Sequence, residues 1–489
     1  MGLWAAVGFC PLLIALSTSS CSLARQTAAR YPAADIDTIY QAPLSGADYN
    51  PVILIHGFTG STLLRKSDDS IAWGAFFTKG SMLPSKPSGL RSIALDIGLL
   101  PQPVKHTDLQ HIDDDTYAAE LLEMVRADAK VANIRHEVYG PMVEMVEDAG
   151  FGECAGLDRR GPPTKAPECF IYFYDWRQDN VGSALGLAAF IERARELVEE
   201  RRKQFAQSSE TPVKFDVVAH SMGSLVTRYF LRYGAKDVLE ESAPPITWAG
   251  AENFDRVILV SPPNFGGMRV LKELMAGQRY PVVKYEAAMF ATWASMYQIL
   301  PREDLAIWLD AEGKPVDFKY SSAQLWRDNL WGGFAPDQDE VLQLLFPRAE
   351  SSEDRKDMLE TYMDAAFDRA RRLAHVLDRH ADTAPEVELV LITSDSESTL
   401  AKAVIEKTNG RVDIKFGVKK PTLTAPGDGS VTRASALADE RLTRNSSGRF
   451  SSPVPWGQRI FLTDFHRTLL GNPTFKNNVL QILLETSAP

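Results

Sequence analysis

Short apolar runs bounded by turn residues recur along the chain. They are three to seven residues long, rich in β-branched and aromatic side chains, and have few alternating polar positions. This pattern is typical of strands buried on both faces of a parallel sheet. The runs that we interpret as strands span residues 52–55, 170–174, 215–219, 257–260, 387–393 and 460–462.

Helical patterns lie between these runs. Residues 185–205 and 358–377 place apolar side chains three and four positions apart, with Glu and Arg on the opposite face. Strands that alternate with amphipathic helices predict βαβ units. The predicted fold class is therefore α/β, with a mostly parallel, doubly wound sheet.

Two stretches interrupt the alternation. Residues 61–115 mix aromatic residues with Gly, Pro and Ser, and residues 265–348 are richer still in large apolar side chains. We predict that residues 45–264 and 349–489 form the two parts of the core. The first stretch would be an insertion in the first part, and residues 265–348 would form a cap or lid. Ligands bind at the carboxyl ends of strands in such sheets, so both insertions are candidate walls of the substrate site. Most of their aromatic side chains are expected to form a core of their own.

The N-terminus, residues 1–21, has the pattern of a signal peptide. Its uncharged stretch from Leu3 to Leu16 is shorter than the roughly 20 residues of a membrane span. Residues 18–21 (Thr-Ser-Ser-Cys) resemble a bacterial lipoprotein cleavage box, in which Cys21 would be lipidated. We expect an exported protein of the periplasm or outer membrane, anchored by lipid at Cys21. Plain secretion is the alternative.

The charge composition argues against a nucleic acid as the partner. The 489 residues contain 53 Lys and Arg against 64 Asp and Glu, a net charge of −11, and a nucleic-acid-binding protein needs a basic face.

Cys154 and Cys169 bracket a loop rich in Gly and Pro, so in an oxidising compartment we expect a disulfide between them. The sequence has no cluster of metal ligands and no phosphate-binding Gly-rich loop, so we predict neither a metal nor a nucleotide cofactor.

The strongest chemical signal is residues 219–223 (Ala-His-Ser-Met-Gly), between a predicted strand and a predicted helix. This is the pattern of a nucleophile elbow, in which a serine stands at a tight turn with small residues two positions before and after it. Ala219 and Gly223 are those small residues, and Ser221 is the predicted nucleophile. Backbone N–H groups at the start of the helix favour negative charge there.

A serine nucleophile needs a base and an acid, which follow it in the order acid, then histidine. His375 and His380 fall in the charged helical region and are expected to face solvent, whereas His466 follows the last predicted strand, where a base must stand. For the acid, Asp395 directly follows a predicted strand and Asp428 lies in a Gly-flanked turn. From the residues alone, Asp395 and Asp428 are nearly equal candidates for the acid, and Asp464 ranks third.

An oxyanion hole is predicted beside the nucleophile. Residues 56–60 (His-Gly-Phe-Thr-Gly) follow the first strand, and the glycines let the backbone approach a substrate. We predict that the backbone N–H groups of Phe58 and Met222 bind the oxyanion.

Taken together, the motifs resemble the lecithin:cholesterol acyltransferase family of α/β-hydrolases. They occur in the same order, and the most discriminating are Tyr-Asp-Trp-Arg at residues 174–177 and Gly-Asp-Gly-Ser-Val at residues 427–431. By this resemblance Ser221, Asp428 and His466 would form a triad, which favours Asp428 as the acid. Arg177 is expected to support the loop architecture by pairing with a carboxylate. Residues 265–348 show no match to this family that we can align.

The resemblance implies a lipase or phospholipase type of serine hydrolase, acting on lipid esters at a membrane or lipid interface. An acyl-enzyme on Ser221 would pass its acyl group to water or, as an O-acyltransferase, to an alcohol. Two other interpretations stay open. One is a carboxylesterase for small soluble esters, and the other is a non-catalytic envelope lipoprotein that binds lipid. The oligomeric state is left open by the sequence.

Overall fold

The computed structural model describes residues 48–76, 87–122, 124–129, 132–158, 161–162, 164–207, 212–279, 284–305, 307–417 and 422–484. The predicted signal peptide and Cys21 therefore lie outside the described residues. Within those ranges, no helix is both long enough and apolar enough to cross a membrane.

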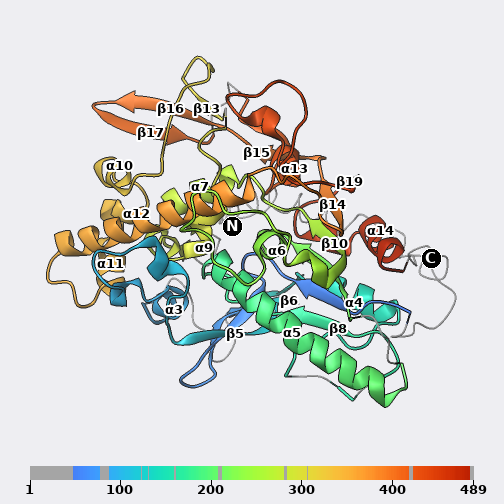
Figure 1. The fold of residues 1–489 in the computed structure, drawn as a ribbon. Coiled ribbons are helices and arrows are strands. Elements are labelled where there is room, and N and C mark those ends of the chain that lie inside the picture. Colours follow the sequence, from blue (N-terminus) through green and yellow to red (C-terminus); the bar gives the residue numbers. More distant parts are fainter. Residues whose placement is uncertain are drawn as a thin grey trace, which may run out of the picture.

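A six-stranded sheet forms the centre of the fold (Figure 1), in the order β19-β14-β10-β9-β1-β8. All neighbouring pairs are parallel. The six predicted strands are all present and their ends shift by up to three residues, so the α/β fold class is confirmed. Their bounds are β1 Val52–Ile55, β8 Cys169–Tyr172, β9 Phe215–His220, β10 Phe254–Val260, β14 Glu388–Ser394 and β19 Gln458–Leu462.

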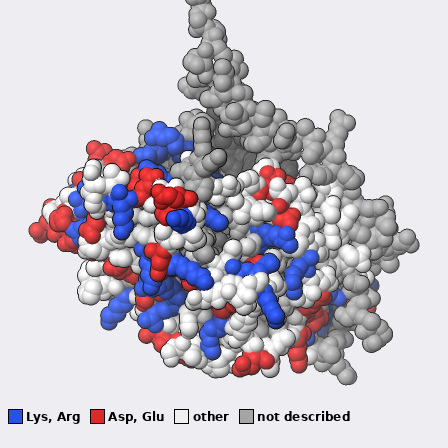
Figure 2. Space-filling view, turned by 90° about the horizontal axis from the view of Figure 1, so that it is seen from above, with Lys and Arg blue, Asp and Glu red and all other residues white. Residues whose placement is uncertain are grey.

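The surface carries charges of both signs. On the face seen in Figure 2, Lys and Arg side chains alternate with Asp and Glu side chains over most of the described surface. The described residues of that face form no continuous basic area of the kind that the phosphates of a nucleic acid require.

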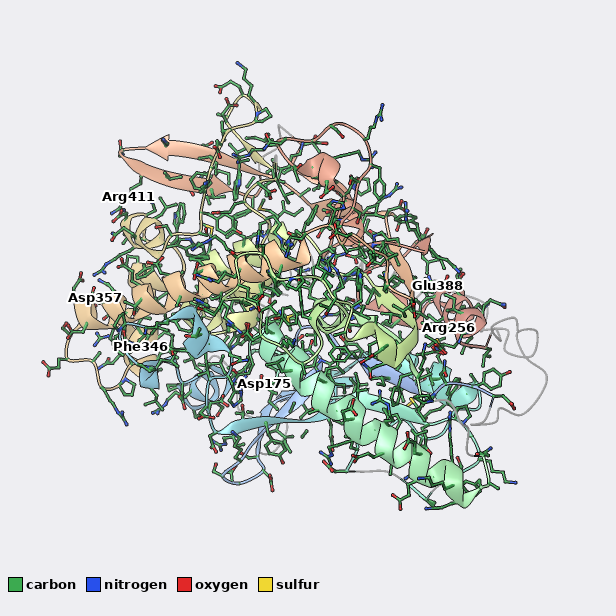
Figure 3. The ribbon with its side chains drawn as sticks, viewed as in Figure 1. Asp175, Arg256, Phe346, Asp357, Glu388 and Arg411 are labelled. Carbon is green, nitrogen blue, oxygen red and sulfur yellow. A yellow bond between two sulfur atoms is a disulfide. The ribbon has the colours of Figure 1, made fainter. Side chains whose placement is uncertain are left out.

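The order of the strands reverses at β1. From β1 the chain passes to β8 on one side, and it then returns to β9 on the other side, where Ile55 is in register with Ala219. The loops that leave β1 and β9 are therefore neighbours at the carboxyl edge of the sheet, which is the usual ligand position in this architecture. At the opposite edge, Arg256 of β10 and Glu388 of β14 are in register and lie close together (Figure 3).

Both faces of the sheet are covered, as a doubly wound fold requires. Ile53 and Ile55 of β1 point into the larger core, with α5 (Asn180–Gln204) and α6 (Gly223–Tyr233). Val52 and Leu54 point into the smaller core, with α4 (Gly140–Asp148) and α14 (Pro473–Leu484). This explains why the strand sequences show no polar alternation.

The described part of residues 61–115 gives no strand to the central sheet. This stretch holds α3 (Pro87–Ile93), β2 (Ser61–Arg65) and β3 (Ile71–Trp73), and the two strands pair antiparallel in a small sheet with β5 (Thr116–Leu121). A second small sheet joins β4 (Ala75–Phe76), β6 (Met124–Ala129) and β7 (Ala132–Glu137).

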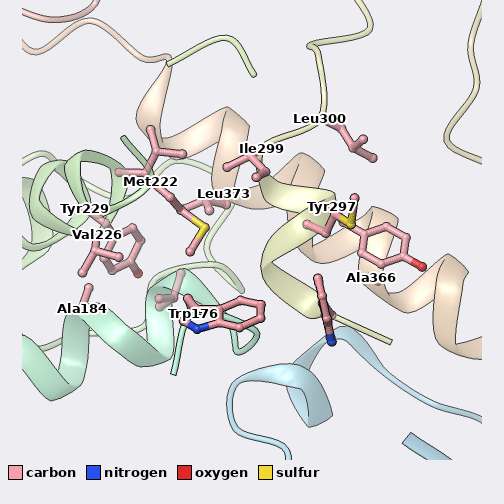
Figure 4. Packing of buried hydrophobic residues seen from close by; sticks show 14 of the residues in the cluster. Trp176, Ala184, Met222, Val226, Tyr229, Tyr297, Ile299, Leu300, Ala366 and Leu373 are labelled. Atoms are coloured by element: carbon pink, nitrogen blue, oxygen red, sulfur yellow. The ribbon is translucent and has the colours of Figure 1, made fainter. Parts of the chain in front are cut away.

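Residues 265–348, as far as the structure describes them, likewise give no strand to the central sheet. They form short helices and turns that pack on α12 (Ser352–Leu377), and their aromatic side chains are mostly buried. Figure 4 shows Tyr297, Ile299 and Leu300 beside Ala366 and Leu373 of α12, in one core with Met222. The elements are α7 Met268–Ala276, β11 Gln278–Arg279, β12 Lys284–Tyr285, α8 Ala287–Phe290, α9 Ala294–Gln298, β13 Trp308–Leu309, α10 Ala323–Asp328 and α11 Asp339–Leu345.

Between β14 and the turn at Asp428 the chain makes an excursion that the strand pattern did not predict. β16 (Ala403–Thr408) and β17 (Arg411–Lys415) form a hairpin that projects from the body (Figure 1). β15 (Glu397–Leu400) and β18 (Thr424–Gly427) pair antiparallel and bring the chain back beside β14. The short helix α13 (Arg433–Leu437) follows.

The predicted disulfide is present. Cys154 and Cys169 are bonded across 15 residues, with their Cα atoms 4.5 Å apart. Because Cys169 begins β8, the bond fixes the preceding loop to the edge of the sheet.

Candidate active site

Ser221 stands at a strained turn between β9 and α6. Its φ is 54°, in the left-handed region that non-glycine residues seldom adopt. Its backbone N–H donates to the carbonyl oxygen of Val260 on β10 at 2.7 Å, so the strained conformation is fixed between two strands. This is the geometry of a nucleophile elbow.

Glycines around the elbow have no room for a side chain. A Cβ on Gly223 would lie 2.2 Å from the carbonyl oxygen of His56, and a Cβ on Gly57 would lie 2.7 Å from the Cβ of Ser221. The two loops at the reversal point are therefore in direct backbone contact, which accounts for the small residues of the motif.

The structure brings the three predicted catalytic side chains together. The Oγ of Ser221 lies 2.9 Å from Nε2 of His466, and Nδ1 of the same ring lies 2.7 Å from Oδ2 of Asp428. His466 follows β19 and Asp428 follows β18, so three separate loops supply the three groups. Such a chain of groups can transfer a proton away from a serine hydroxyl.

Asp428 is fully buried and held rigidly. Its Oδ1 accepts hydrogen bonds from the N–H groups of Ser430 at 2.9 Å and Val431 at 2.7 Å. Burial alone would raise the pKa of this carboxyl, but the His466 ring and these N–H groups hold it below its usual value. The carboxylate is therefore charged at neutral pH.

The alternative acids point elsewhere. Asp395 forms an ion pair with Arg433 at 3.2 Å. Asp464 accepts hydrogen bonds from Thr468 and, at 3.1 Å, from Asn472. Within the described residues, Asp428 is the carboxylate that is bonded to the His466 ring.

The alternative histidines also lie outside the site. His375 is on α12 and bonds the carbonyl oxygen of Ser242 at 3.1 Å. His380 was expected in the same helix, but the chain turns after Leu377 and α12 ends there. The His380 ring lies 2.9 Å from Glu440. Neither ring is bonded to Ser221.

The predicted oxyanion groups flank the elbow. Within the described part of the chain, the N–H groups of Phe58 and Met222 donate to no protein acceptor. The ring of Phe58 packs edge-on against Trp176 at 5.2 Å and Trp293 at 5.7 Å between ring centroids. Trp293 belongs to residues 265–348, so this segment contacts the turn that carries one of the two N–H groups.

The arginine of the Tyr-Asp-Trp-Arg motif anchors the loop that follows β8. Arg177 is fully buried and pairs with Asp175 at 2.6 Å and Asp114 at 2.7 Å, which confirms the prediction that it pairs with a carboxylate. It also donates to the carbonyl oxygens of Ile93 and Ala94, at 3.1 and 3.3 Å. Its role is therefore to join the loop after β8 to residues 93–114.

Two side chains that the sequence analysis did not assign lie directly behind the site. The hydroxyl of Tyr139 accepts the N–H of Gly57 at 2.7 Å and contacts Nδ1 of His220 at 3.0 Å. Nε2 of His220 lies 3.1 Å from the carbonyl oxygen of His466. His220 was part of the elbow motif, but Tyr139 lies 81 residues away from it and carries no local signal.

Part of the chain matches a known protein family. The family model for lecithin:cholesterol acyltransferase matches residues 166–383. The resemblance to this family is confirmed. The matched segment of this chain contains Ser221 and the Tyr-Asp-Trp-Arg motif, and it ends before Asp428 and His466.

The chain is also similar to solved structures. The chain is similar to one in the Tle4–Tli4 complex, with 15% identity and a TM-score of 0.51, over 92% of this chain and 100% of that one. It is also similar to EstA from Clostridium botulinum, with 14% identity and a TM-score of 0.33, over 94% of each chain. For Staphylococcus hyicus lipase the identity is 12% and the TM-score 0.32, over 91% of this chain and 95% of that one. No curated protein matches the chain.

Proposed function

We propose that this protein is a serine hydrolase of the lipase or phospholipase type, which cleaves carboxylic esters of lipids through an acyl-enzyme on Ser221. The observation that carries the proposal is the contact of Ser221 Oγ with His466 Nε2 at 2.9 Å, continued by His466 Nδ1 and Asp428 at 2.7 Å. The match to the lecithin:cholesterol acyltransferase family supports a lipid ester hydrolase or acyltransferase at a general level.

In the first half-reaction His466 Nε2 takes the proton of Ser221 as Oγ attacks the ester carbonyl carbon. Asp428 accepts the Nδ1–H of His466, which fixes the tautomer and stabilises the imidazolium. The N–H groups of Phe58 and Met222 donate to the oxyanion of the tetrahedral intermediate. When that intermediate collapses, the ester C–O bond breaks and His466 returns the proton to the leaving alcohol.

In the second half-reaction a nucleophile attacks the acyl-enzyme while its proton passes to His466. Water gives a free fatty acid, and a lipid alcohol gives a new ester, and in both cases Ser221 recovers its proton. We favour hydrolysis as the main outcome, with transfer to an alcohol as a second outcome of the same intermediate. Residues 265–348 are proposed to wall the acyl site, which the contact of Trp293 with Phe58 supports.

Labelling with a fluorophosphonate, followed by mass spectrometry of the peptides, tests the nucleophile. We expect the label on Ser221, and we expect hydrolysis of long-chain esters that is higher with micelles or vesicles than with monomeric short-chain esters. Ser221→Ala should lose both the label and the activity while its circular dichroism is unchanged. A label on another residue would contradict the proposal, and equal rates on short and long chains would favour a carboxylesterase for small esters instead.

We further propose that the protein is exported to the periplasm or outer membrane and anchored by lipid at Cys21, where it meets its substrate at a lipid interface. The support is the signal-like pattern of residues 1–21. Metabolic labelling with a fatty acid in a bacterial host should mark the protein and not its Cys21→Ser variant. Equal labelling of the two would contradict the anchor.

A further inference from the structure

A chain of hydrogen bonds runs behind the three catalytic groups and uses two side chains that the proposed reaction leaves without a role. Gly57 N–H donates to the Tyr139 hydroxyl at 2.7 Å, and that hydroxyl lies 3.0 Å from His220 Nδ1. His220 Nε2 then lies 3.1 Å from the carbonyl oxygen of His466. Both side chains are buried. These hydrogen bonds therefore join the turn at residues 56–60, which we call the oxyanion turn, to the main chain of the catalytic base His466.

The direction of each hydrogen bond follows from the groups themselves. A carbonyl oxygen can only accept, so His220 must carry its proton on Nε2 and donate it to His466. In the neutral ring Nδ1 is then an acceptor, and the hydrogen of the Tyr139 hydroxyl points to it. The oxygen of that hydroxyl remains free to accept the N–H of Gly57. All three donors thus point the same way, from Gly57 towards His466, which strengthens the chain as a whole.

The surroundings keep His220 neutral. Burial lowers the pKa of His220 well below its usual value, and the charges of His466 and Arg467 act in the same direction, while the hydrogen bond to the His466 carbonyl oxygen and the charge of Asp428 act in the opposite one. The rings of His220 and His466 lie 4.8 Å apart between centroids. A single tautomer of His220 therefore persists while the base beside it gains and loses a proton.

We propose that Tyr139 and His220 are positioning residues, which hold the oxyanion turn and the catalytic base in register with each other. This inference rests on the proposed function of Ser221, Asp428 and His466. On one side, Tyr139 fixes the peptide of Gly57, whose neighbour Phe58 supplies an oxyanion N–H. On the other side, His466 is held at both ends of its residue, because its N–H donates to Asp428 at 2.8 Å and its carbonyl accepts from His220.

Packing leaves Tyr139 little freedom to move. A Cβ on Gly60 would lie 2.8 Å from the Tyr139 ring, and the ring also meets His220 edge-on at 5.6 Å. The Tyr139 hydroxyl is therefore placed by the ring, and its hydrogen bonds set the distance between the two loops.

The first test compares Tyr139→Phe with Tyr172→Phe. Both remove one buried tyrosine hydroxyl, and that of Tyr172 donates to Ser183 at 2.6 Å on the outer strand β8. Because misplacement by about 1 Å can cost about 100-fold in rate, we expect Tyr139→Phe to lower kcat about 10- to 100-fold with KM changed less than about 3-fold. Tyr172→Phe should leave kcat within about 2-fold. Equal kcat in the two variants, or a change in KM alone, would overturn the inference.

His220 provides a second comparison. Glutamine can place an amide N–H near the position of Nε2, so His220→Gln keeps a donor for His466, whereas His220→Ala removes it. We expect the rate of fluorophosphonate labelling at Ser221 to fall less in His220→Gln than in His220→Ala. Equal labelling rates in the two variants would overturn the role of the donor.

A measurement without substrate separates this inference from the proposed function. In the full-length protein with 15N-labelled histidine, the ring signals missing from His220→Gln identify His220. We expect them to report the Nε2–H tautomer from pH 8 to pH 6, and to change in Tyr139→Phe but not in Tyr172→Phe. The Nδ1–H tautomer would overturn the inference even if the enzyme hydrolyses lipid esters. The Nε2–H tautomer would support the hydrogen-bond chain even if no ester is cleaved.

Discussion

Asp428 holds His466 at two places. Its carboxylate oxygen lies 2.7 Å from Nδ1 of the ring, and its carbonyl oxygen accepts the backbone N–H of His466 at 2.8 Å. The second contact is independent of the side chain. A substitution that changes only the carboxylate therefore leaves the base in place, and the chemical role of the charge can be measured by itself.

Asp428→Asn is expected to lower kcat/KM for ester hydrolysis about 10³- to 10⁴-fold, because an amide favours the wrong tautomer of His466 and leaves the imidazolium without a counter-charge. The matched control is Asp395→Asn, since Asp395 was the alternative acid and instead pairs with Arg433. The control should keep kcat/KM within about 2-fold. A larger loss in Asp395→Asn than in Asp428→Asn would contradict the assignment of the acid.

Gly57→Ala should lower the activity more than the stability of the protein. The added Cβ would lie 2.7 Å from the Cβ of Ser221 and 3.3 Å from its Oγ, so the hydroxyl or the oxyanion turn has to shift. We expect kcat to fall by more than about 100-fold. Gly417→Ala is the control, because no atom of the described residues lies within 4 Å of its added Cβ. The prediction fails if both variants keep the wild-type kcat.

Arg177→Met tests whether the Tyr-Asp-Trp-Arg motif acts through stability. The substitution removes a fully buried cation from the carboxylates of Asp175 and Asp114, whose side chains are only 14% and 6% exposed, and breaking such a pair typically costs about 3–5 kcal/mol of unfolding free energy. In Arg193→Met the lost partner is Asp158, and both side chains of that pair are mostly exposed, so the expected cost is below about 0.5 kcal/mol. Thermal unfolding measures both. Similar melting temperatures for the two variants would contradict a structural role for Arg177.

The sequence predicted the central sheet well because its signal is local. Each strand is a continuous apolar run, and the elbow at Ser221 needs small neighbours within two residues, so both are visible in a short window. His466 could be placed for the same reason, since it follows the last run directly.

The choice between Asp395 and Asp428 could not be made from local pattern. Asp395 directly follows β14, whereas Asp428 returns to that edge only because β18 pairs with β15, with Gly427 opposite Glu397. Such a pairing depends on contacts between distant residues. Tyr139 was missed for a similar reason, because its contacts with Gly57 and His220 are separated by 82 and 81 residues.

Asp216 of β9 provides a pH-dependent test of the core. It accepts hydrogen bonds from Asn50 at 3.2 Å and Arg256 at 3.1 Å. Burial raises the pKa of this carboxyl from 3.8 to about 6, an effect that Arg256 offsets only in part. Between these two values the folded state binds the proton more strongly than the unfolded state does. The contribution of Asp216 to stability is therefore full below pH 3.8 and declines as the pH rises to about 6.

Asp216→Asn removes this titration. At about 1.4 kcal/mol per pH unit over roughly two units, we expect the variant to gain about 2–3 kcal/mol relative to the wild type between pH 4 and pH 7. Melting temperatures at a series of pH values measure the gain. Asp255→Asn is the control for the loss of one carboxylate beside Asn50, because Asp255 accepts a hydrogen bond from the same Asn50 at 2.8 Å but is about one-third exposed. A constant difference between wild type and Asp216→Asn across this range would show that Asp216 is already ionised at pH 4 in the folded protein, with Arg256 outweighing the cost of burial.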